Sequence, residues 1–359
     1  MGFYAQLDRG ALFERADVYR VAYDPERATR EPLRVAILGA GGVAQAKYLP
    51  ALAQLRTRWE QFELVGLSTL DARQAEKLST VWGTPAYTDS VALLREREPE
   101  VVIVTSSDEA HRELAVAALE AGAHVLVEKP IALSLRAAEE ICSTAEATGR
   151  TLMTTCNKRY SPPYAETRRL LVSGMPPRPA LFSAKFTLGY AYIDLLESGT
   201  VHLFDLARWL MGDIRRVAAA GAFASSEHIV VTLDFQSGAI GSLVTSARAL
   251  SLHPWERVEI FGDGAWLAVD DQRTLTLHEA EFEPARRWAP VVPSTLLSAE
   301  EWGGYVGMLE AFFAAVRRRD AAGIRDGYRA LELVVATRLA LARGTAVELP
   351  LDPDDPDLR

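Results

Sequence analysis

"LRVAILGAGGVA", residues 33–44, joins an apolar, β-branched run to a glycine turn and then to a helix-like segment. The apolar run predicts a buried strand. Gly39 makes the tight turn, Gly41 lets the backbone approach a pyrophosphate, and Ala44 lets helix and strand pack closely. The N-terminus of the following helix attracts an anion. Strand, glycine turn and helix in this order predict a dinucleotide-binding site, with a glycine turn that binds no ligand as the alternative.

Apolar strands alternate with helical stretches up to about residue 156, which predicts an α/β fold with a doubly wound parallel sheet. The carboxyl ends of parallel strands meet at one edge, where such sheets bind ligands. We therefore expect the polar and small residues at these ends to contact the dinucleotide. They are Gly39, Gly41, Gly42, Val43, Ser68, Thr69, Thr105, Ser106, Glu128 and Lys129, with His111 at the start of a nearby helix.

The end of the second strand bears on the choice of cofactor. Proteins of this kind that prefer NAD usually carry a carboxylate there for the ribose 2′-hydroxyl. This chain has Ser68 and Thr69, while Asp71 opens "DARQ", a predicted helix N-cap. Arg73, on the first turn of that helix, can bind an added phosphate by a charge-assisted hydrogen bond. The sequence predicts NAD or NADP as cofactor, with NADP slightly favoured.

"VLVEKPIALS", residues 125–134, places Glu128 and Lys129 at the end of an apolar strand, just before Pro130. Two charges at such a position are costly unless they are paired, solvated or functional. Pro130 restricts Lys129 to extended backbone and permits a cis peptide bond at modest cost. Lys129 is therefore either a catalytic residue or one half of an ion pair with Glu128.

The pattern changes after Asn157. Several alternating strands linked by hairpin turns, "QSG" and "GDG", predict an antiparallel meander in an α+β domain. Between the first two of these strands, "HLFDLARWLMGD" predicts an amphipathic helix that starts near His202 and has Asp205 on the same face. A helix-start histidine bonded to backbone is the alternative for His202.

Composition limits the classes of function. A length of 359 residues suits two domains, with 49% apolar and 24% charged residues. A net charge of −9 argues against nucleic acid or an anionic membrane surface as partner, and no apolar run is long enough to span a bilayer. Two cysteines, Cys142 and Cys156, without a CxxC pair suit a reducing cytoplasm and exclude a thiolate zinc site. We expect no metal.

Together these motifs resemble the glucose–fructose oxidoreductase / inositol dehydrogenase (Gfo/Idh/MocA) family. The resemblance covers about residues 32–345 and rests on "VAILGAGGVA", "VVIVTSSDEAH", "AVAALEAGAHVLVEKPIAL", "CNKRYSP" and "GTVHLFDLARWLMGD". It implies a Rossmann domain followed by an α+β domain with an open-faced, mainly antiparallel sheet that forms a homodimer or homotetramer. It also implies hydride transfer between NAD(P) and a secondary alcohol or ketone of a sugar, cyclitol or related polyol.

The resemblance divides the chain into three parts. Residues 1–30 are an N-terminal extension, residues 31–156 the dinucleotide-binding Rossmann domain, and residues 157–359 the substrate-binding and oligomerisation domain.

Matched position by position, Lys129 corresponds to the catalytic lysine of the family, and His202 to the histidine of its second motif. Asn157 and Arg159 match positions that line cofactor or substrate, and Asp205 matches the acid three residues after the histidine. The resemblance also implies a cis bond before Pro130. The residues expected to contact substrate are Lys129, Asn157, Tyr160, Ser198 and His202.

Ser198 departs from the family pattern, because an aspartate usually stands four residues before the histidine. Asp194 or Glu197 could bring a carboxylate nearby. We expect His202 to be the main base, with Lys129 positioning the reacting oxygen and Asp205 fixing the histidine side of its helix. Two other functions stay open: a protein that binds dinucleotide or sugar without turnover, which Ser198 favours, and an NAD-assisted, redox-neutral lyase or glycosidase.

Overall fold

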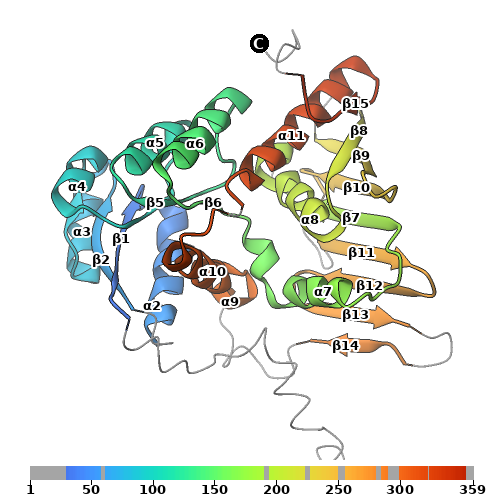
Figure 1. Ribbon diagram of the computed structural model, residues 1–359, viewed down its shortest axis with the longest axis horizontal. Coiled ribbons are helices and arrows are strands. Elements are labelled where there is room, and N and C mark those ends of the chain that lie inside the picture. The colour runs from blue at the N-terminus through green and yellow to red at the C-terminus, as the bar shows by residue number, and fades with distance from the viewer. Residues whose placement is uncertain are drawn as a thin grey trace, which may run out of the picture.

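The structure is a computed structural model that describes residues 30–57, 61–189, 194–222, 227–249, 255–279, 284–289, 299–321 and 323–352. Residues 1–29 of the expected N-terminal extension lie outside the described residues. Two sheets lie side by side, and the C-terminal helices α10 (Tyr305–Arg318) and α11 (Asp326–Arg343) run between them (Figure 1).

The first sheet has six parallel strands in the order β3-β2-β1-β4-β5-β6, which confirms the predicted doubly wound sheet. Its strands are β1 (Leu33–Leu38), β2 (Phe62–Ser68), β3 (Ala86–Tyr87), β4 (Val101–Val104), β5 (His124–Val127) and β6 (Leu152–Thr154). Because β1 pairs with both β2 and β4, the strand order reverses at β1, directly before the glycine turn. Sheets of this kind bind ligands at that switch point.

Helices connect these strands. They are η3 (Ala44–Tyr48), α2 (Leu49–Thr57), α3 (Ala72–Trp82), α4 (Ser90–Arg97), η4 (Asp108–Ala110), α5 (His111–Glu120) and α6 (Leu135–Thr148). Helix α3 begins as predicted, since one carboxylate oxygen of Asp71 accepts from the backbone N–H groups of Arg73 and Gln74, at 2.8 and 3.0 Å. The helix after the glycine turn begins with a π-helical turn, η3, which the sequence pattern did not reveal.

The second sheet has nine strands in the order β14-β13-β12-β11-β7-β10-β9-β8-β15. Strand β7 lies between β11 and β10 and runs parallel to β10, while the other neighbours are antiparallel, so the sheet is mixed rather than a simple meander. Its strands are β7 (Leu181–Thr187), β8 (Ile214–Gly221), β9 (His228–Phe235), β10 (Ile240–Ser246), β11 (Glu256–Gly262), β12 (Ala265–Asp270), β13 (Thr274–His278), β14 (Arg286–Trp288) and β15 (Val347–Glu348).

Helices α7 (Pro162–Val172), α8 (Val201–Met211) and α11 lie on the face of this sheet that is turned toward the first sheet (Figure 1). The opposite face exposes apolar side chains in neighbouring strands: Ile240 is 55%, Val244 49% and Val230 45% exposed. On the same face the Trp266 ring stacks on His278, with the ring centroids 4.0 Å apart. The predicted open-faced sheet is therefore present, and its open face is partly apolar.

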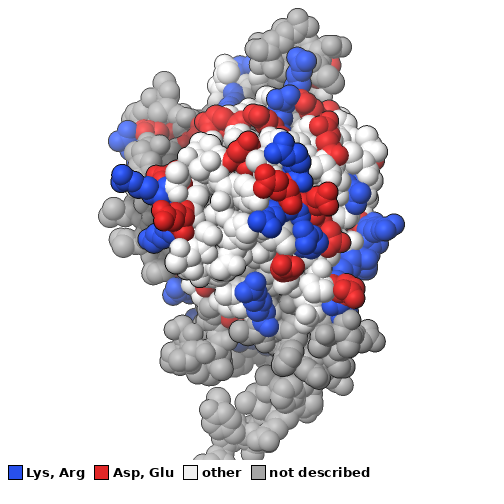
Figure 2. Space-filling view, turned by 90° about the vertical axis from the view of Figure 1, so that its left-hand side faces the viewer, with Lys and Arg blue, Asp and Glu red and all other residues white. Residues whose placement is uncertain are grey.

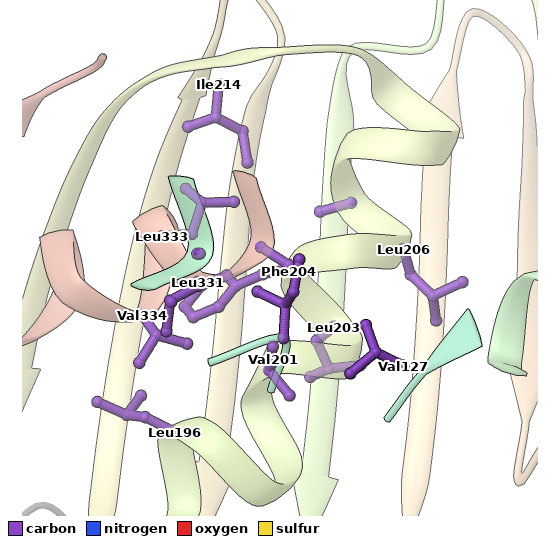
Figure 3. Close-up of a cluster of buried hydrophobic side chains, with 14 of the residues drawn as sticks. Val127, Leu196, Val201, Leu203, Phe204, Leu206, Ile214, Leu331, Leu333 and Val334 are labelled. Atoms are coloured by element: carbon purple, nitrogen blue, oxygen red, sulfur yellow. The ribbon is translucent and has the colours of Figure 1, made fainter. Parts of the chain in front are cut away.

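Apolar packing joins the two parts of the chain. Val127, the last residue of β5, and Leu203 of α8 belong to one buried cluster, and Figure 3 shows their side chains next to each other. Helix α10 packs through Phe312 and Phe313 into a second cluster that contains β1 and α2. The end of β5 and the start of α8 are thus held together by a buried core.

The surface view of Figure 2, from the side on which α3 and α4 lie in Figure 1, shows acidic and basic side chains intermixed. Binding to a nucleic-acid backbone requires a continuous basic surface, and this face lacks one. Among the described residues no helix has the length and apolar character needed to cross a bilayer.

Candidate active site

A pocket of about 660 Å³ opens at the carboxyl ends of β1, β2 and β4. Eight of the residues predicted to contact a dinucleotide line it: Gly39, Gly41, Gly42, Val43, Ser68, Thr69, Thr105 and Ser106. The pocket is long enough along the sheet edge to reach Asp89 and Ser90 at the start of α4. The glycine turn therefore lines an open pocket, which a ligand-binding turn requires.

The glycine turn fits a pyrophosphate because its backbone is close to the sheet on one side and open on the other. Gly39 has a φ of +86°, and a Cβ there would lie 2.4 Å from the Cα of Ser106. A Cβ on Gly42 would meet no atom within 4 Å. A side chain at Gly39 would push the turn away from β4, whereas the open side at Gly42 leaves room for phosphate oxygens.

Hydroxyl and amide groups form the rim after β2. The Thr69 hydroxyl donates to Gln74 Oε1 at 3.0 Å, and Ser68 Oγ lies 2.8 Å from Ser90 Oγ. Asp89 also lines the pocket, but its carboxylate caps α4 by accepting from two backbone N–H groups. Arg73 is exposed on the first turn of α3 and does not line the pocket.

The Glu128 carboxylate is held by neutral donors at the end of β5. It accepts from the Tyr48 hydroxyl at 2.7 Å, the Thr155 hydroxyl at 2.8 Å and the backbone N–H of Lys129 at 2.9 Å. Burial, and next the charge of Glu128, raise the pKa of Tyr48, so this donor keeps its proton. None of these contacts is a side-chain ion pair between Glu128 and Lys129, which was the alternative expected from the sequence.

The Lys129 ammonium instead donates to the main-chain carbonyl of Ser198, at 3.4 Å. The Lys129–Pro130 bond is cis, as the resemblance implied. Ser198 lies in the π-helical turn η6 (Leu196–Thr200), which leads directly into α8 and His202. Lys129 from the first sheet, and Ser198 and His202 from the second part of the chain, are thus brought together.

The environment of His202 keeps its imidazole neutral. Burial, and then the positive charges of Lys158 and Lys129, lower the pKa of His202 well below its ordinary value. A neutral imidazole can accept a proton, which is what a general base requires. The same cations that lower this pKa can hold a negatively polarised oxygen beside the ring.

Lys158 is a candidate functional residue that the sequence analysis missed. Its side chain is 5% exposed, its ammonium contacts the Glu256 carboxylate, and it lies 5.2 Å from the ring centroids of both Phe186 and Trp255. The Tyr164 hydroxyl donates to the other oxygen of Glu256 at 2.6 Å. A lysine is rarely buried unless it is paired. Its place in "CNKRYSP" was a signal, but the partner, Glu256, is 98 residues further along the chain.

Arg159 does not lie at the dinucleotide pocket, where the resemblance had led us to expect it. Its guanidinium forms two hydrogen bonds with Asp205 of α8 and a third, of 2.7 Å, with Asp326 of α11. Asp205 accordingly holds α8 through Arg159 and not through a contact with His202. The arrangement favours a positioning role for Arg159.

The other predicted residues lie beside the site. Asn157 Nδ2 donates to the carbonyl of Gly303 at 2.7 Å, and the Tyr160 hydroxyl donates to the sulfur of Met153 at 3.4 Å. Burial raises the pKa of Tyr160 to about 12. His111 begins α5 as expected, but it is fully buried with Nδ1 2.8 Å from the carbonyl of Pro130, behind the Lys129 segment and not in the pocket.

Asp194 and Glu197 do not replace the family aspartate. Arg338 of α11 pairs with both, at 2.9 Å and 2.7 Å. The expectation that one of them could serve Lys129 and His202 is therefore not met, because their charges are already compensated. Among the described residues, no group of three or more His, Cys, Asp or Glu side chains could hold a metal ion.

Two regions of the chain match known families. Residues 33–156 match the oxidoreductase family with an NAD-binding Rossmann fold (GFO_IDH_MocA), and residues 192–268 match the GFO/IDH/MocA C-terminal domain.

Three named dehydrogenases are similar in sequence to most of this chain. The D-apiose dehydrogenase of Paraburkholderia graminis is 27% identical, with 80% of this chain and 83% of that protein covered. The D-glucoside 3-dehydrogenase of Escherichia coli is 27% identical, with 89% and 99% covered. The myo-inositol 2-dehydrogenase of Thermotoga maritima is 26% identical, with 74% and 84% covered.

Among solved structures, levoglucosan dehydrogenase in complex with NADH superimposes with a TM-score of 0.80 at 19% identity, covering 90% of this chain and 100% of that one. At this identity the likeness shows the fold. With both family matches, the strand order and the glycine turn in agreement, the chain belongs to the Gfo/Idh/MocA family of oxidoreductases.

Proposed function

We propose that this protein transfers a hydride between NAD(P) and a secondary alcohol or ketone of a sugar, cyclitol or related polyol. The observation that carries the proposal is the meeting of Lys129 with the Ser198–His202 segment at the sheet edge that also carries the glycine-turn pocket. The substrate class rests on the relatives, which are named as dehydrogenases of apiose, inositol and glucosides.

The nicotinamide, when bound, takes or gives the hydride. His202, whose pKa is lowered, removes the hydroxyl proton when an alcohol is oxidised and returns it in the reverse direction. The Lys129 ammonium has three N–H donors, and its contact with the Ser198 carbonyl uses one of them. Another donates to the reacting oxygen. Glu128 takes no part in proton transfer, because three neutral donors already bind its carboxylate.

The two domains have different roles. Residues 31–156 bind the dinucleotide, and residues 157–359 hold the substrate and form a homodimer or homotetramer through the open face of the nine-stranded sheet. The apolar side chains of Ile240, Val244 and Val230 on that face support the oligomer. The two buried free cysteines support a cytoplasmic location.

NADP(H) is accepted at least as well as NAD(H). The rim after β2 offers the Thr69 hydroxyl, and no carboxylate stands directly at the strand end, where one would repel a 2′-phosphate. Arg73 lies exposed near that rim and supplies a positive charge.

Two measurements test the proposal. Purified protein is titrated with NAD(H) and NADP(H), and cofactor reduction is then followed with a panel of sugars and cyclitols. Dinucleotide binding with net cofactor turnover supports the oxidoreductase. Binding without turnover would favour the binding protein that Ser198 suggests, and product formation without net reduction would favour the redox-neutral enzyme. The variant Gly39→Ala is the control for the pocket, since its Cβ would collide with Ser106.

A further inference from the structure

A second pocket lies at the opposite edge of the six-stranded sheet from the glycine turn. It has a volume of about 220 Å³ and lies where β1 and β5 begin, next to the C-terminal end of α10. The lining residues are Leu33, Glu100, Gly122, His124, Arg150, Val316, Arg317 and Arg319. None of them belongs to the proposed catalytic or dinucleotide-binding groups.

Arginines outnumber carboxylates among the residues that line this pocket. Arg150, Arg317 and Arg319 contribute three guanidinium groups, whereas Glu100 is the carboxylate among the lining residues. One oxygen of Glu100 already accepts from the backbone N–H of Arg34, at 3.1 Å. Like charges this close repel one another unless an anion lies between them.

Arg150 is the strongest sign of a missing partner. Its Nε is buried and has no hydrogen-bond partner among the residues that the structure describes. Its Nη2 lies 3.4 Å from the position that a Cβ on Gly122 would take, so the glycine leaves room for the guanidinium. A buried donor without an acceptor costs free energy, and a guanidinium fork matches two oxygens of an oxyanion.

His124 adds a neutral donor to the pocket. Its Nδ1 accepts from the backbone N–H of Thr151 at 2.9 Å, so the neutral ring carries its proton on Nε2. Burial, and then the charges of Arg150 and Arg319, lower the pKa of His124. An N–H donor beside guanidinium groups suits an anion and disfavours a cation.

Main-chain groups cap the end of α10. At the helix end, the carbonyls of Val316 and Ala315 accept from the backbone N–H groups of Arg319 and Asp320, at 3.0 and 2.9 Å. Arg317 is fixed at the rim of the pocket, because its two Nη atoms donate to the carbonyls of Glu31 and Gln61. The Arg317 guanidinium is therefore held by the main chain, while Arg150 and Arg319 line the same pocket.

We propose that this pocket binds a small tetrahedral oxyanion, namely inorganic phosphate or the phosphate group of a phosphate monoester. Its volume of about 220 Å³ suits such a group and is much smaller than the roughly 660 Å³ at the glycine turn. Binding places the anion between Arg150, Arg319 and His124.

Calorimetric titration of the full-length protein with inorganic phosphate, at constant low ionic strength, tests the site. Loss of one charge-assisted hydrogen bond weakens binding about tenfold, so Arg150→Gln should bind phosphate about tenfold more weakly than the wild type. Arg95→Gln removes the same charge from an exposed surface position, where the side chain is 77% exposed, and should leave the affinity unchanged. Equal affinity of wild type and Arg150→Gln, or no saturable binding by the wild type, would overturn the proposal.

The glycine turn could also bind phosphate, so Gly39→Ala is titrated in parallel. This variant should keep the phosphate affinity of the wild type even if it no longer binds dinucleotide, which separates this site from the proposed function. Loss of phosphate binding in Gly39→Ala would assign the anion to the glycine turn and overturn the proposal. Glycerol 3-phosphate serves as the monoester. If it binds more tightly than inorganic phosphate, the ligand of this pocket is a phosphate monoester; if it binds more weakly, the ligand is free phosphate.

Thermal unfolding distinguishes a binding role of Arg150 from a structural one. Without phosphate, Arg150→Gln should be at least as stable as the wild type, because one of three like charges is removed. With phosphate, the wild type should gain stability and the variant should gain little. A variant that is less stable by the same amount with and without phosphate would show that Arg150 serves the fold, contrary to the proposal.

Discussion

Arg159 binds Asp205 through two parallel hydrogen bonds and so fastens the turn after β6, η5 (Asn157–Tyr160), to helix α8. The side chains are 12% and 2% exposed, and Arg159 also binds Asp326 at the start of α11. His202 lies on the first turn of the same helix. The position of the proposed base therefore depends on an ion pair that it does not touch.

The variant Asp205→Asn should lower both stability and turnover. The substitution removes one of the two carboxylates that bind the buried Arg159 and leaves Asp326 as the other, so the free energy of unfolding should fall by up to about 3 kcal/mol. The kcat should fall because α8 loses its anchor, while dinucleotide affinity stays near the wild-type value. Denaturant unfolding and steady-state kinetics measure these effects.

Arg112→Gln is the matched control, because Arg112 forms an ion pair with Glu140 on the surface. The side chains of Arg112 and Glu140 are 50% and 42% exposed. An exposed pair contributes less than about 1 kcal/mol, so this variant should behave like the wild type. A positioning role for Asp205 is contradicted if Asp205→Asn lowers dinucleotide affinity as strongly as kcat.

Lys129→Ala and His202→Ala should each reduce turnover by about 10²–10⁴, the usual effect of losing a positioned acid–base group. Ser198→Ala should cost much less, because Lys129 contacts the main-chain carbonyl of Ser198, and alanine keeps that carbonyl. Steady-state cofactor reduction measures all three, with dinucleotide titration as the control for folding. Wild-type turnover in His202→Ala would remove this histidine from the mechanism.

The first sheet could be predicted from the sequence because its signals are local. Gly39 and Gly41 follow an apolar strand and precede a helix, and Asp71 caps α3 through residues two and three positions away. The position of β7 between β11 and β10 could not be predicted in the same way. A strand shows the same alternation of buried and exposed residues whatever its neighbours in the sheet are. Which strands pair depends on contacts between segments that are distant in the sequence.

Within the site, the sequence indicated positions but not partners. Lys129 and His202 lie in recognisable motifs, whereas the partners of Lys158 and Arg159 are Glu256 and Asp205, 98 and 46 residues away. Asp194 and Glu197 looked able to replace the missing family aspartate, because the sequence does not reveal that Arg338 of α11, more than 140 residues away, pairs with both.

Arg73→Ala should weaken NADP(H) binding and leave NAD(H) binding nearly unchanged. Arg73 is exposed on the first turn of α3, whose N-cap and backbone hydrogen bonds do not involve its side chain. A charge-assisted hydrogen bond to a 2′-phosphate contributes about 1.5–3 kcal/mol, which corresponds to a loss of roughly tenfold or more in affinity. Fluorescence titration with both reduced cofactors measures the ratio, and an equal loss for both would contradict a phosphate contact.

Gly199→Ala should destabilise the protein by about 1–3 kcal/mol, the usual cost of overpacking a core. A Cβ on Gly199 would lie 2.7 Å from a ring carbon of Phe186 and 2.8 Å from a methyl group of Leu188. Phe186 is one of the two rings beside Lys158, so its displacement should also lower kcat. Denaturant unfolding checks the first effect; Gly42→Ala, where a Cβ meets nothing within 4 Å, is the control.

The stability of the protein should fall as the pH drops below about 6.5, the ordinary pKa of an unfolded histidine. Burial and nearby cations lower the pKa of His202 in the folded state, and burial also lowers that of His124. Between the lowered folded pKa and 6.5, the unfolded chain binds protons that the folded chain does not, so acid favours unfolding.

Each such histidine contributes a slope of at most about 1.4 kcal/mol per pH unit in the free energy of unfolding. His202→Asn should reduce the slope measured by urea unfolding between pH 5 and pH 7, while His124 accounts for part of what remains. His228→Asn is the comparison, because His228 bonds Ser246 in the second sheet, away from both pockets. If stability is independent of pH over this range, His202 is not held neutral by its surroundings and cannot be the base proposed for it.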